Sequence, residues 1–350
     1  MSARTRLILA FAAVYTIWGS TYLAIRVGVG TIPPFLMAGG RFLFAGVLMT
    51  AIARAQGAAW PGWKQWRSTL IVGFLLLIGG NGALTWAEQI VPSGLASLLV
   101  ATVPLWMVLL DWARPGGIRP KNLVFVGLAM GLVGLAVLVG PELTEGLAML
   151  RGPQQALGVA PLGVGIVVVL FGSFSWALGS IVARGVEMPK APMMGTGMEN
   201  LNAVVLMLAI SLASGDAAKL DASAVTTDSL LAFFYLVFIG SLIGYTAYIY
   251  ILNHATAAQV ATYAYVNPVV AVFLGWLLLD EALTGRTLAG AAIIVVAVAL
   301  ITLARGRRRS TLPAGAAQRE AAELPTVQLG EKARESSGYA PADPCPEPCP

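Results

Sequence analysis

Charged side chains, cysteine and histidine are scarce in this sequence of 350 residues. Only 11% of the residues are charged and 57% are hydrophobic, against about 25% charged in an ordinary soluble domain, which excludes a water-soluble globule. The two cysteines, Cys345 and Cys349, are too few for a disulfide framework or a thiolate metal site. We therefore predict neither a metal nor a cofactor.

Motifs for nucleotide-driven or enzymatic chemistry are also missing. No phosphate-binding loop of the form GxxxxGK[ST] occurs, which argues against an ATP-driven pump. A nucleophile activated by histidine would have to use His254, which falls in a predicted turn. The adjacent acidic pair, Asp280 and Glu281, lies at the end of an apolar run without further acidic ligands. We predict that the protein is not an enzyme and has no catalytic residues, with an intramembrane enzyme as the weakest alternative.

Long apolar runs recur along the chain up to Arg305. A helix that crosses a bilayer needs about 20 consecutive, mostly apolar residues. The runs predict an all-α polytopic membrane protein with ten transmembrane helices, near residues 7–29, 33–53, 69–89, 93–112, 121–140, 162–183, 194–214, 229–251, 257–279 and 286–304.

The basic residues lie in the short gaps between these runs, so the net charge of +5 reflects topology and does not indicate a nucleic-acid partner. If the N-terminus is cytoplasmic, fourteen Lys and Arg residues fall in cytoplasmic segments and four fall in outer loops, namely Arg26, Arg151, Lys219 and Arg286. Lys and Arg are enriched in cytoplasmic loops. We predict a multi-pass protein of the cell (inner) membrane with both termini cytoplasmic.

The two halves of the chain resemble each other. A shift of 158 residues superposes Trp18 on Trp176 and Arg26 on Arg184, and a shift of 164 pairs Gly80 with Gly244 and Pro104 with Pro268. Five spans in each half would insert the second half in the opposite sense, as an inverted repeat. We predict repeats at 1–153 and 154–309 and a disordered cytoplasmic tail at 310–350 that contains both cysteines.

Several segments carry a family resemblance over residues 7–304. These are WGSTYLAIRVG, IPPFLMAGGRF, VPSGLASLLVATVPLW and ATYAYVNPVVAVFLGWLLLDEALT. They resemble the EamA family of the drug/metabolite transporter superfamily and, within it, the YedA-type exporters. The resemblance implies ten helices in two inverted five-helix repeats, a central cavity and transport without ATP hydrolysis. It implies no particular substrate.

Two charged residues inside the predicted spans are the leading site candidates. Arg41 and Glu199 each follow an equivalent proline, Pro34 or Pro192, by seven residues. Ionisable groups within a membrane are costly and usually face a bundle interior or a wet cavity. Arg41 could hold an anionic group of the substrate, and Glu199 could bind a cation or exchange a proton. The structural alternative is an ion pair or a side chain that snorkels to the interface.

Kinked helices at matching places in two repeats point to a transporter binding site. Pro104 and Pro268 fall near the middle of their predicted spans, where proline leaves a carbonyl without its helical partner. Thr102 and Asn267 lie beside them and are unsuited to a lipid-facing position. We predict that these four residues line the site, the alternative being kinks that serve packing.

Aromatic side chains could line a cavity for flat or cationic substrates, although aromatics near span ends are more often interfacial anchors. We predict the cavity role for Trp18, Trp176, Tyr248 and Tyr265. Asn81 lies in the third span and joins the candidate set. The predicted function is a secondary transporter that exports small metabolites or drugs by alternating access, with proton coupling as a hypothesis. A channel or passive facilitator is the main alternative.

Two other features receive structural interpretations. Glu88 and Gln89 fall near the predicted outer end of the third span, where water can solvate a carboxylate, and we predict no site there. Gly127, Gly131 and Gly134 form a small-residue stripe that permits close helix contact. Such a stripe serves helix packing or a homodimer. The expected partners of the protein are therefore a small-molecule substrate, the lipid bilayer and, through this stripe, a second copy of the chain.

Overall fold

A computed structural model describes residues 2–114, 120, 122–150, 162–255 and 262–310 of the chain. The chain divides into a unit of residues Met1–Leu312 and a second unit, Pro313–Pro350. The second unit, with Cys345 and Cys349, lies outside the described residues, as does all of the predicted 310–350 tail except Ser310, the last residue of α14 (Gly285–Ser310). The predicted boundary between residues 153 and 154 also lies outside them.

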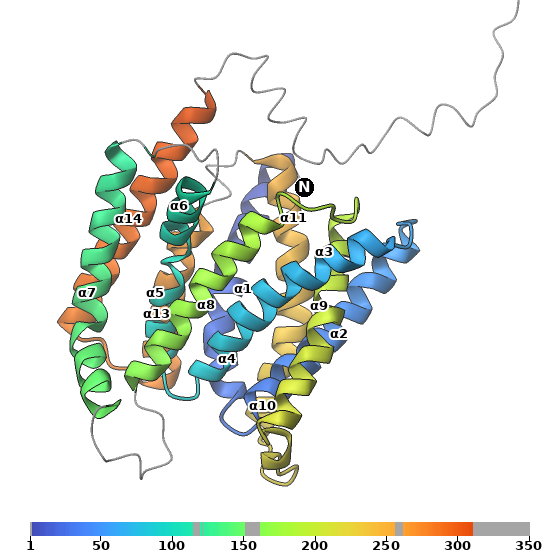
Figure 1. Cartoon of the computed structure of the whole chain (residues 1–350), viewed down its shortest axis with the longest axis horizontal. Helices are drawn as coiled ribbons and strands as arrows, with labels where there is room; N and C mark the ends of the chain where they lie inside the picture. The colour runs from blue at the N-terminus through green and yellow to red at the C-terminus, as the bar shows by residue number, and fades with distance from the viewer. Residues whose placement is uncertain (1, 115–119, 121, 151–161, 256–261, 311–350) are drawn as a thin grey trace, which may run out of the picture. The chain divides into compact units, whose positions relative to one another are not determined.

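Every element of the described part is helical, and no strand occurs among these residues (Figure 1). The elements are α1 (Ala3–Gly28), α2 (Pro34–Ala55), α3 (Trp63–Gly73), η1 (Phe74–Gly82), α4 (Ala83–Ala87), α5 (Ser93–Val100), α6 (Val103–Ala113), α7 (Asn122–Leu150), α8 (Leu162–Val182), α9 (Pro192–Ala213), η3 (Ala217–Lys219), α10 (Thr227–Phe234), η4 (Tyr235–Ile243), α11 (Gly244–His254), α13 (Tyr263–Leu279) and α14 (Gly285–Ser310). The all-helical prediction is confirmed for this part of the chain.

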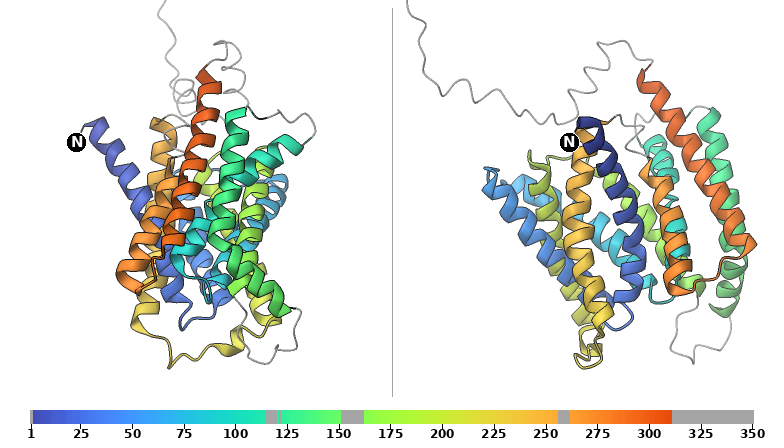
Figure 2. Two further views of the ribbon diagram at one scale, coloured as in Figure 1. Left: turned by 90° about the vertical axis from the view of Figure 1, so that its left-hand side faces the viewer. Right: turned by 180° about the vertical axis from the view of Figure 1, so that it is seen from behind.

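Ten helical segments overlap the ten predicted spans, of which residues 121 and 257–261 lie outside the described residues. Seven are long and apolar enough to cross a membrane, and three shorter apolar helices lie at Asn122–Leu138, Tyr263–Leu279 and Gly285–Ile301. The chain runs up and down through these segments, and α1 begins at the same end at which α14 finishes (Figures 1 and 2). An even number of crossings is consistent with this arrangement.

The second and seventh segments begin and end in the same way. Both α2 and α9 contain 22 residues and carry a proline, Pro34 or Pro192, in the first turn, where its missing N–H costs no helical hydrogen bond. Each is followed by a glycine with positive φ, Gly57 at 86° and Gly215 at 69°. Glycine adopts this left-handed conformation readily, so it terminates each helix without backbone strain.

The third and eighth segments each contain a π-helical stretch of nine residues, η1 and η4. In η4 the Ser241 hydroxyl donates to the Leu236 carbonyl five residues earlier at 2.9 Å. Stretches of π-helix are rare and frequently lie at functional sites. Hydropathy gives no signal for them, so the apolar runs did not predict them.

Helices α2 and α9 pack against each other at glycines. A Cβ at Gly39 would lie 3.6 Å from Leu208 Cδ2, and a Cβ at Gly197 would lie 3.0 Å from the Thr50 backbone nitrogen. The contact is antiparallel, since the residue numbers rise along one helix as they fall along the other. Gly39 and Gly197 are equivalent under the 158-residue shift, as are Thr50 and Leu208, so each helix presents the same surface to the other.

A second pair of contacts links the π-helical segments to tryptophans. A Cβ at Gly80 would lie 3.4 Å from Trp176 Cβ on α8, and a Cβ at Gly244 would lie 3.0 Å from Trp18 Cδ1 on α1. Both glycines and both tryptophans are repeat equivalents. The glycine of each half therefore contacts the tryptophan of the other half.

The glycine stripe of α7 is used within the chain. Helices α7 and α14 lie side by side in Figures 1 and 2, and Cβ atoms at Gly127 and Gly134 would approach Ile301 and Ile293 of α14. A Cβ at Gly131 would meet Leu105 of α6. These contacts account for the predicted stripe as helix packing, so it gives no support to a homodimer.

Replacing Gly46 with leucine should destabilise the α2–α9 contact. A Cβ at this position would lie 3.1 Å from the Gly197 carbonyl oxygen and 3.0 Å from Leu201 Cγ. Overpacking of a tight contact costs about 1–3 kcal/mol, so we expect a lower thermal unfolding temperature of the purified protein. Val47→Leu, at a neighbouring side chain that is 50% exposed, is the matched control. Equal unfolding temperatures for the two variants would contradict the close packing.

Candidate transport site

Arg41 lies in the second turn of α2 and is partly buried. Its Nε donates a hydrogen bond to the Ser241 hydroxyl of η4 at 3.3 Å, and its guanidinium carbon lies 5.8 Å from the Phe42 ring centroid. Among the described residues it forms no ion pair. Most of its five donors are therefore available to a bound anionic group.

Glu199 occupies the equivalent turn of α9 and is also partly buried. Within the described residues no hydrogen bond or ion pair engages its carboxylate. The Tyr245 phenol is near enough to interact electrostatically with the Glu199 carboxyl group. The Thr196 hydroxyl donates to the Tyr245 hydroxyl oxygen at 2.8 Å. Arg41 and Glu199 are not paired with each other, so the ion-pair alternative does not apply in this conformation.

The span that contains Pro104 is broken instead of merely kinked. Helix α5 ends at Val100 and α6 begins at Val103, which places Pro104 in the first turn of the second piece. The Thr102 hydroxyl donates to the Leu99 carbonyl at 2.6 Å, and the Ser173 hydroxyl of α8 reaches the same carbonyl at 3.3 Å. These hydroxyls supplement the Thr102 backbone N–H, which donates to the same carbonyl at 3.1 Å, so Thr102 has a structural role at the break.

Pro268 lies inside α13 and is buried. Its neighbour Asn267 is 7% exposed, and the amide oxygen of Asn267 has no hydrogen-bond partner among the described residues. Gly19 of α1 packs against the Asn267 backbone, because a Cβ there would lie 3.2 Å from the Asn267 carbonyl oxygen. A buried, unpartnered acceptor next to a proline is a feature expected of a binding position.

The structure brings together some of the predicted aromatic residues. The ring centroids of Trp18 and Tyr248 lie 4.9 Å apart, and Tyr263 packs edge-on against both, at 5.4 Å from Trp18 and 5.9 Å from Tyr248. Trp176 is not part of this cluster, since it packs on Gly80, and Tyr265 packs in a different apolar cluster. The Asn81 side chain and carbonyl oxygens both accept from the Thr85 hydroxyl.

The prediction that water solvates the Glu88 carboxylate was wrong. This residue caps the C-terminus of α4, and its side chain is 0% exposed instead of solvated. Neither carboxylate oxygen has a hydrogen-bond partner in the described part of the chain. Gln89, the next residue, is exposed as predicted. Burial of Glu88 results from segments distant in sequence, so hydropathy around the span end could not reveal it.

Glu281, just after α13, holds the N-terminus of α5. Its Oε1 accepts from the Ser93 backbone N–H at 2.6 Å and from the Ser93 hydroxyl at 2.8 Å, and its Oε2 accepts from the Gly94 N–H at 2.9 Å. A carboxylate at a helix N-terminus satisfies donors that lack helical partners and also complements the helix dipole. The contact joins the two halves of the chain at one end of the bundle.

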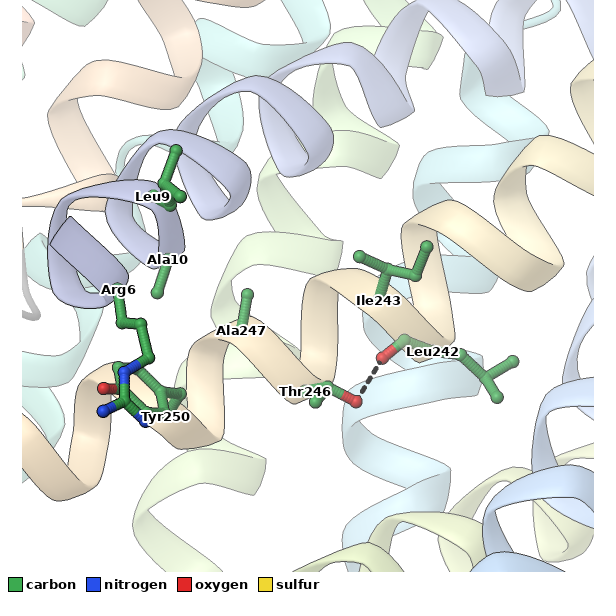
Figure 3. Close-up of a pocket in the computed structure, with 8 residues that line it drawn as sticks. All are labelled: Arg6, Leu9, Ala10, Leu242, Ile243, Thr246, Ala247 and Tyr250. Carbon is green, nitrogen blue, oxygen red and sulfur yellow. Dashed lines mark hydrogen bonds between the residues drawn. The ribbon is translucent and has the colours of Figure 1, made fainter. Parts of the chain in front are cut away.

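Two clefts lie outside this set of residues. One of about 440 Å³ lies between α1 and the η4–α11 segment (Figure 3), and its lining is Arg6, Leu9, Ala10, Leu242, Ile243, Thr246, Ala247 and Tyr250. Its Thr246 hydroxyl bonds within its own helix to the Leu242 carbonyl at 2.7 Å. The other, of about 180 Å³, lies beside Glu281. None of the predicted site residues lines either cleft.

Seven described helices of this chain are long and apolar enough to cross a membrane, and the described part encloses polar groups without partners there. These are the features of a multi-pass membrane protein. The chain belongs to the EamA-like transporter family, which matches residues 5–140 and 163–303, and it is a membrane transporter. The family resemblance seen in the sequence is confirmed.

Individual relatives agree with the family. The inner membrane transporter YedA of Escherichia coli strain K12 is 39% identical over 297 residues, which cover 85% of this chain and 90% of YedA. A protein of Salmonella typhimurium named "Probable amino-acid metabolite efflux pump" is 29% identical, over 81% of this chain and 90% of its own. A solved crystal structure aligns with a TM-score of 0.57 and 21% identity, over 86% of this chain and 99% of its own, which shows a shared fold.

Proposed function

We propose that the protein is a secondary carrier that exports a small metabolite or drug across the inner membrane by alternating access. The observation that carries the proposal is the reciprocity of the contacts between the halves. Gly80 contacts Trp176 while Gly244 contacts Trp18, and Gly39 contacts Leu208 while Gly197 contacts Thr50. Each contact between the halves thus occurs twice, once with the partners exchanged between the halves. A two-fold axis that relates the halves produces this pattern.

Such an axis supports two five-helix repeats, 1–153 and 154–309, of opposite topology. Inverted repeats let two similar halves exchange conformations, so that one face opens while the other closes around a site near the midplane. The basic-loop asymmetry supports cytoplasmic termini, and the common end of α1 and α14 fits that orientation (Figure 2). The inner membrane location is supported by similarity to YedA.

Differences between equivalent positions support an inward-facing conformation. Arg26, at the end of α1, is partly buried, whereas its repeat equivalent Arg184 is exposed. At the end of the bundle that contains Arg26, Glu281 ties the second half to the N-terminus of α5. We assign this closed end to the outer face. In the alternate state, the outer end opens and the region around Arg184 closes.

The substrate site that we propose lies among Arg41, Glu199, Asn267, Trp18 and Tyr248. Arg41 provides a guanidinium and Glu199 a carboxyl group, neither of them in an ion pair within the described residues, while Asn267 provides an acceptor without a partner there. This combination fits a small solute that carries both an acidic and a basic group next to an apolar or flat portion. The name of the Salmonella relative, an amino-acid metabolite efflux pump, supports the same class and the direction of export.

The proposal can be tested before the substrate is identified. Untargeted comparison of external metabolites from cells with and without the overexpressed protein should identify a compound enriched outside. Proton coupling predicts that collapse of the proton gradient reduces its export, because no nucleotide site supplies the energy. Export that persists unchanged after collapse would argue against proton coupling, and no change in any external metabolite would argue against an exporter.

A further inference from the structure

Glu88 is the most deeply buried carboxylate of the described spans and their ends, and it has no assigned role. Its side chain is 0% exposed, and both carboxylate oxygens lack a hydrogen-bond partner within the described residues. An ionised carboxylate in this state would be severely penalised by the loss of hydration. Buried charged groups are instead paired, hydrogen-bonded or neutralised.

Titratable groups nevertheless lie near it on several neighbouring elements, whereas α8, which also packs against α4, has no titratable side chain. Arg26 and Tyr22 approach from α1, Arg41 from α2, and Glu281 from the segment after α13. Arg26 Nη1 donates to the backbone carbonyl of Glu88 and not to its carboxylate. Neither arginine forms an ion pair in the described part of the chain.

This arrangement fits a neutral carboxylic acid better than a carboxylate. A carboxylate binds a guanidinium more strongly than a backbone carbonyl does, because the bond is charge-assisted and can be bidentate. An ionised Glu88 would therefore draw Arg26 away from the carbonyl. The guanidinium is already adjacent, so the exchange of partners needs a side-chain rotation and no change of fold.

We propose that Glu88 is the proton-binding group that controls closure of the outer end. When the outer end is open, the carboxylate is ionised and pairs with Arg26 or Arg41. On closure a proton passes from external water to a carboxylate oxygen, the ion pair breaks, and Arg26 turns to the Glu88 carbonyl. This inference rests on the proposed transport function, since it places one proton in the cycle at each closure.

The protonation state can be measured directly by infrared difference spectroscopy of the full chain in lipid at neutral pH. The wild-type spectrum minus that of Glu88→Gln should contain a carboxylic acid C=O band. The matched control is Glu187→Gln, which removes an exposed carboxylate away from Glu88 and Glu281 in the sequence and should remove carboxylate bands only. A Glu88→Gln difference spectrum with only carboxylate bands would overturn the proposal.

Closure can be measured by labelling with a membrane-impermeant maleimide. Val91 is 0% exposed and lies close to Glu88 in sequence, so Val91→Cys, with both native cysteines changed to serine, reports on the outer end. We expect its labelling, normalised to Ser223→Cys in an exposed loop, to rise with pH and to stay low in a Glu88→Gln background. The same pH response in both backgrounds would refute the proposal. Neither the infrared nor the labelling measurement needs a substrate. A failure of this proposal can therefore be distinguished from a failure of the proposed transport function.

Discussion

Arg41→Ala and Glu199→Gln should each reduce transport of the exported compound by at least about tenfold. Both ionisable side chains lie inside the spans without an ion-pair partner in the described residues, which leaves them available to the substrate in this conformation. Removing one partner of a buried charge pair costs about 2–5 kcal/mol, and about 1.4 kcal/mol corresponds to a tenfold change in affinity. Uptake into proteoliposomes at several concentrations measures the effect.

The matched controls are Arg54→Ala and Glu187→Gln, which remove the same charges from exposed positions near the helix ends. These variants should transport like the wild type. Folding is checked by comparing unfolding temperatures, since a loss of transport without a loss of stability isolates the site. Normal transport by both Arg41→Ala and Glu199→Gln would show that the site has been assigned to the wrong residues.

A disulfide across the outer end should stop transport almost completely and reversibly. A Cβ at Gly94 of α5 would lie 3.2 Å from the Val272 Cα of α13 and 3.4 Å from its Cγ2, within the reach of a disulfide. The double variant Gly94→Cys and Val272→Cys, with Cys345 and Cys349 changed to serine, would fix α5 to α13. Because alternating access requires these helices to separate, we expect oxidation to abolish transport and reduction to restore it.

The control disulfide lies on the peripheral α7–α14 pair. A Cβ at Gly290 would lie 3.0 Å from Leu138 Cβ, so Gly290→Cys with Leu138→Cys should also form a cross-link. Neither Leu138 nor Gly290 is one of the proposed site residues, and oxidation of this pair should leave most of the transport intact. Full transport by the oxidised α5–α13 variant, once the cross-link is verified by gel mobility, would contradict a moving outer end.

The fold was largely predictable because a bilayer imposes a simple length and hydropathy rule. The predicted span at 162–183 matches α8 (Leu162–Val182), and the predicted span at 33–53 matches α2 (Pro34–Ala55). Local irregularities were less accessible. Pro104 signalled a disturbance, but it did not show that the span divides into α5 and α6, where the Thr102 and Ser173 hydroxyls both contact the Leu99 carbonyl.

The candidate site was predictable only in part. The sequence identified Arg41 and Glu199 because charges inside long apolar runs are conspicuous. It missed Glu88, since a carboxylate at a span end is solvated unless distant segments cover it. Helices α8 and α2 pack against α4, and Arg26 of α1 contacts the Glu88 backbone. Tertiary contacts of this kind leave no local pattern. The aromatic set was divided for the same reason, with Trp18 and Tyr248 in one cluster and Trp176 elsewhere.

Counterflow in proteoliposomes tests alternating access most directly. Vesicles are loaded with the unlabelled exported compound and diluted into a trace of the labelled form, without any ion gradient. A carrier that returns loaded through the membrane should accumulate label transiently above its external concentration, with saturation as the internal concentration rises. Label that only equilibrates, at a rate that does not saturate, would contradict the account and indicate a channel or passive facilitator.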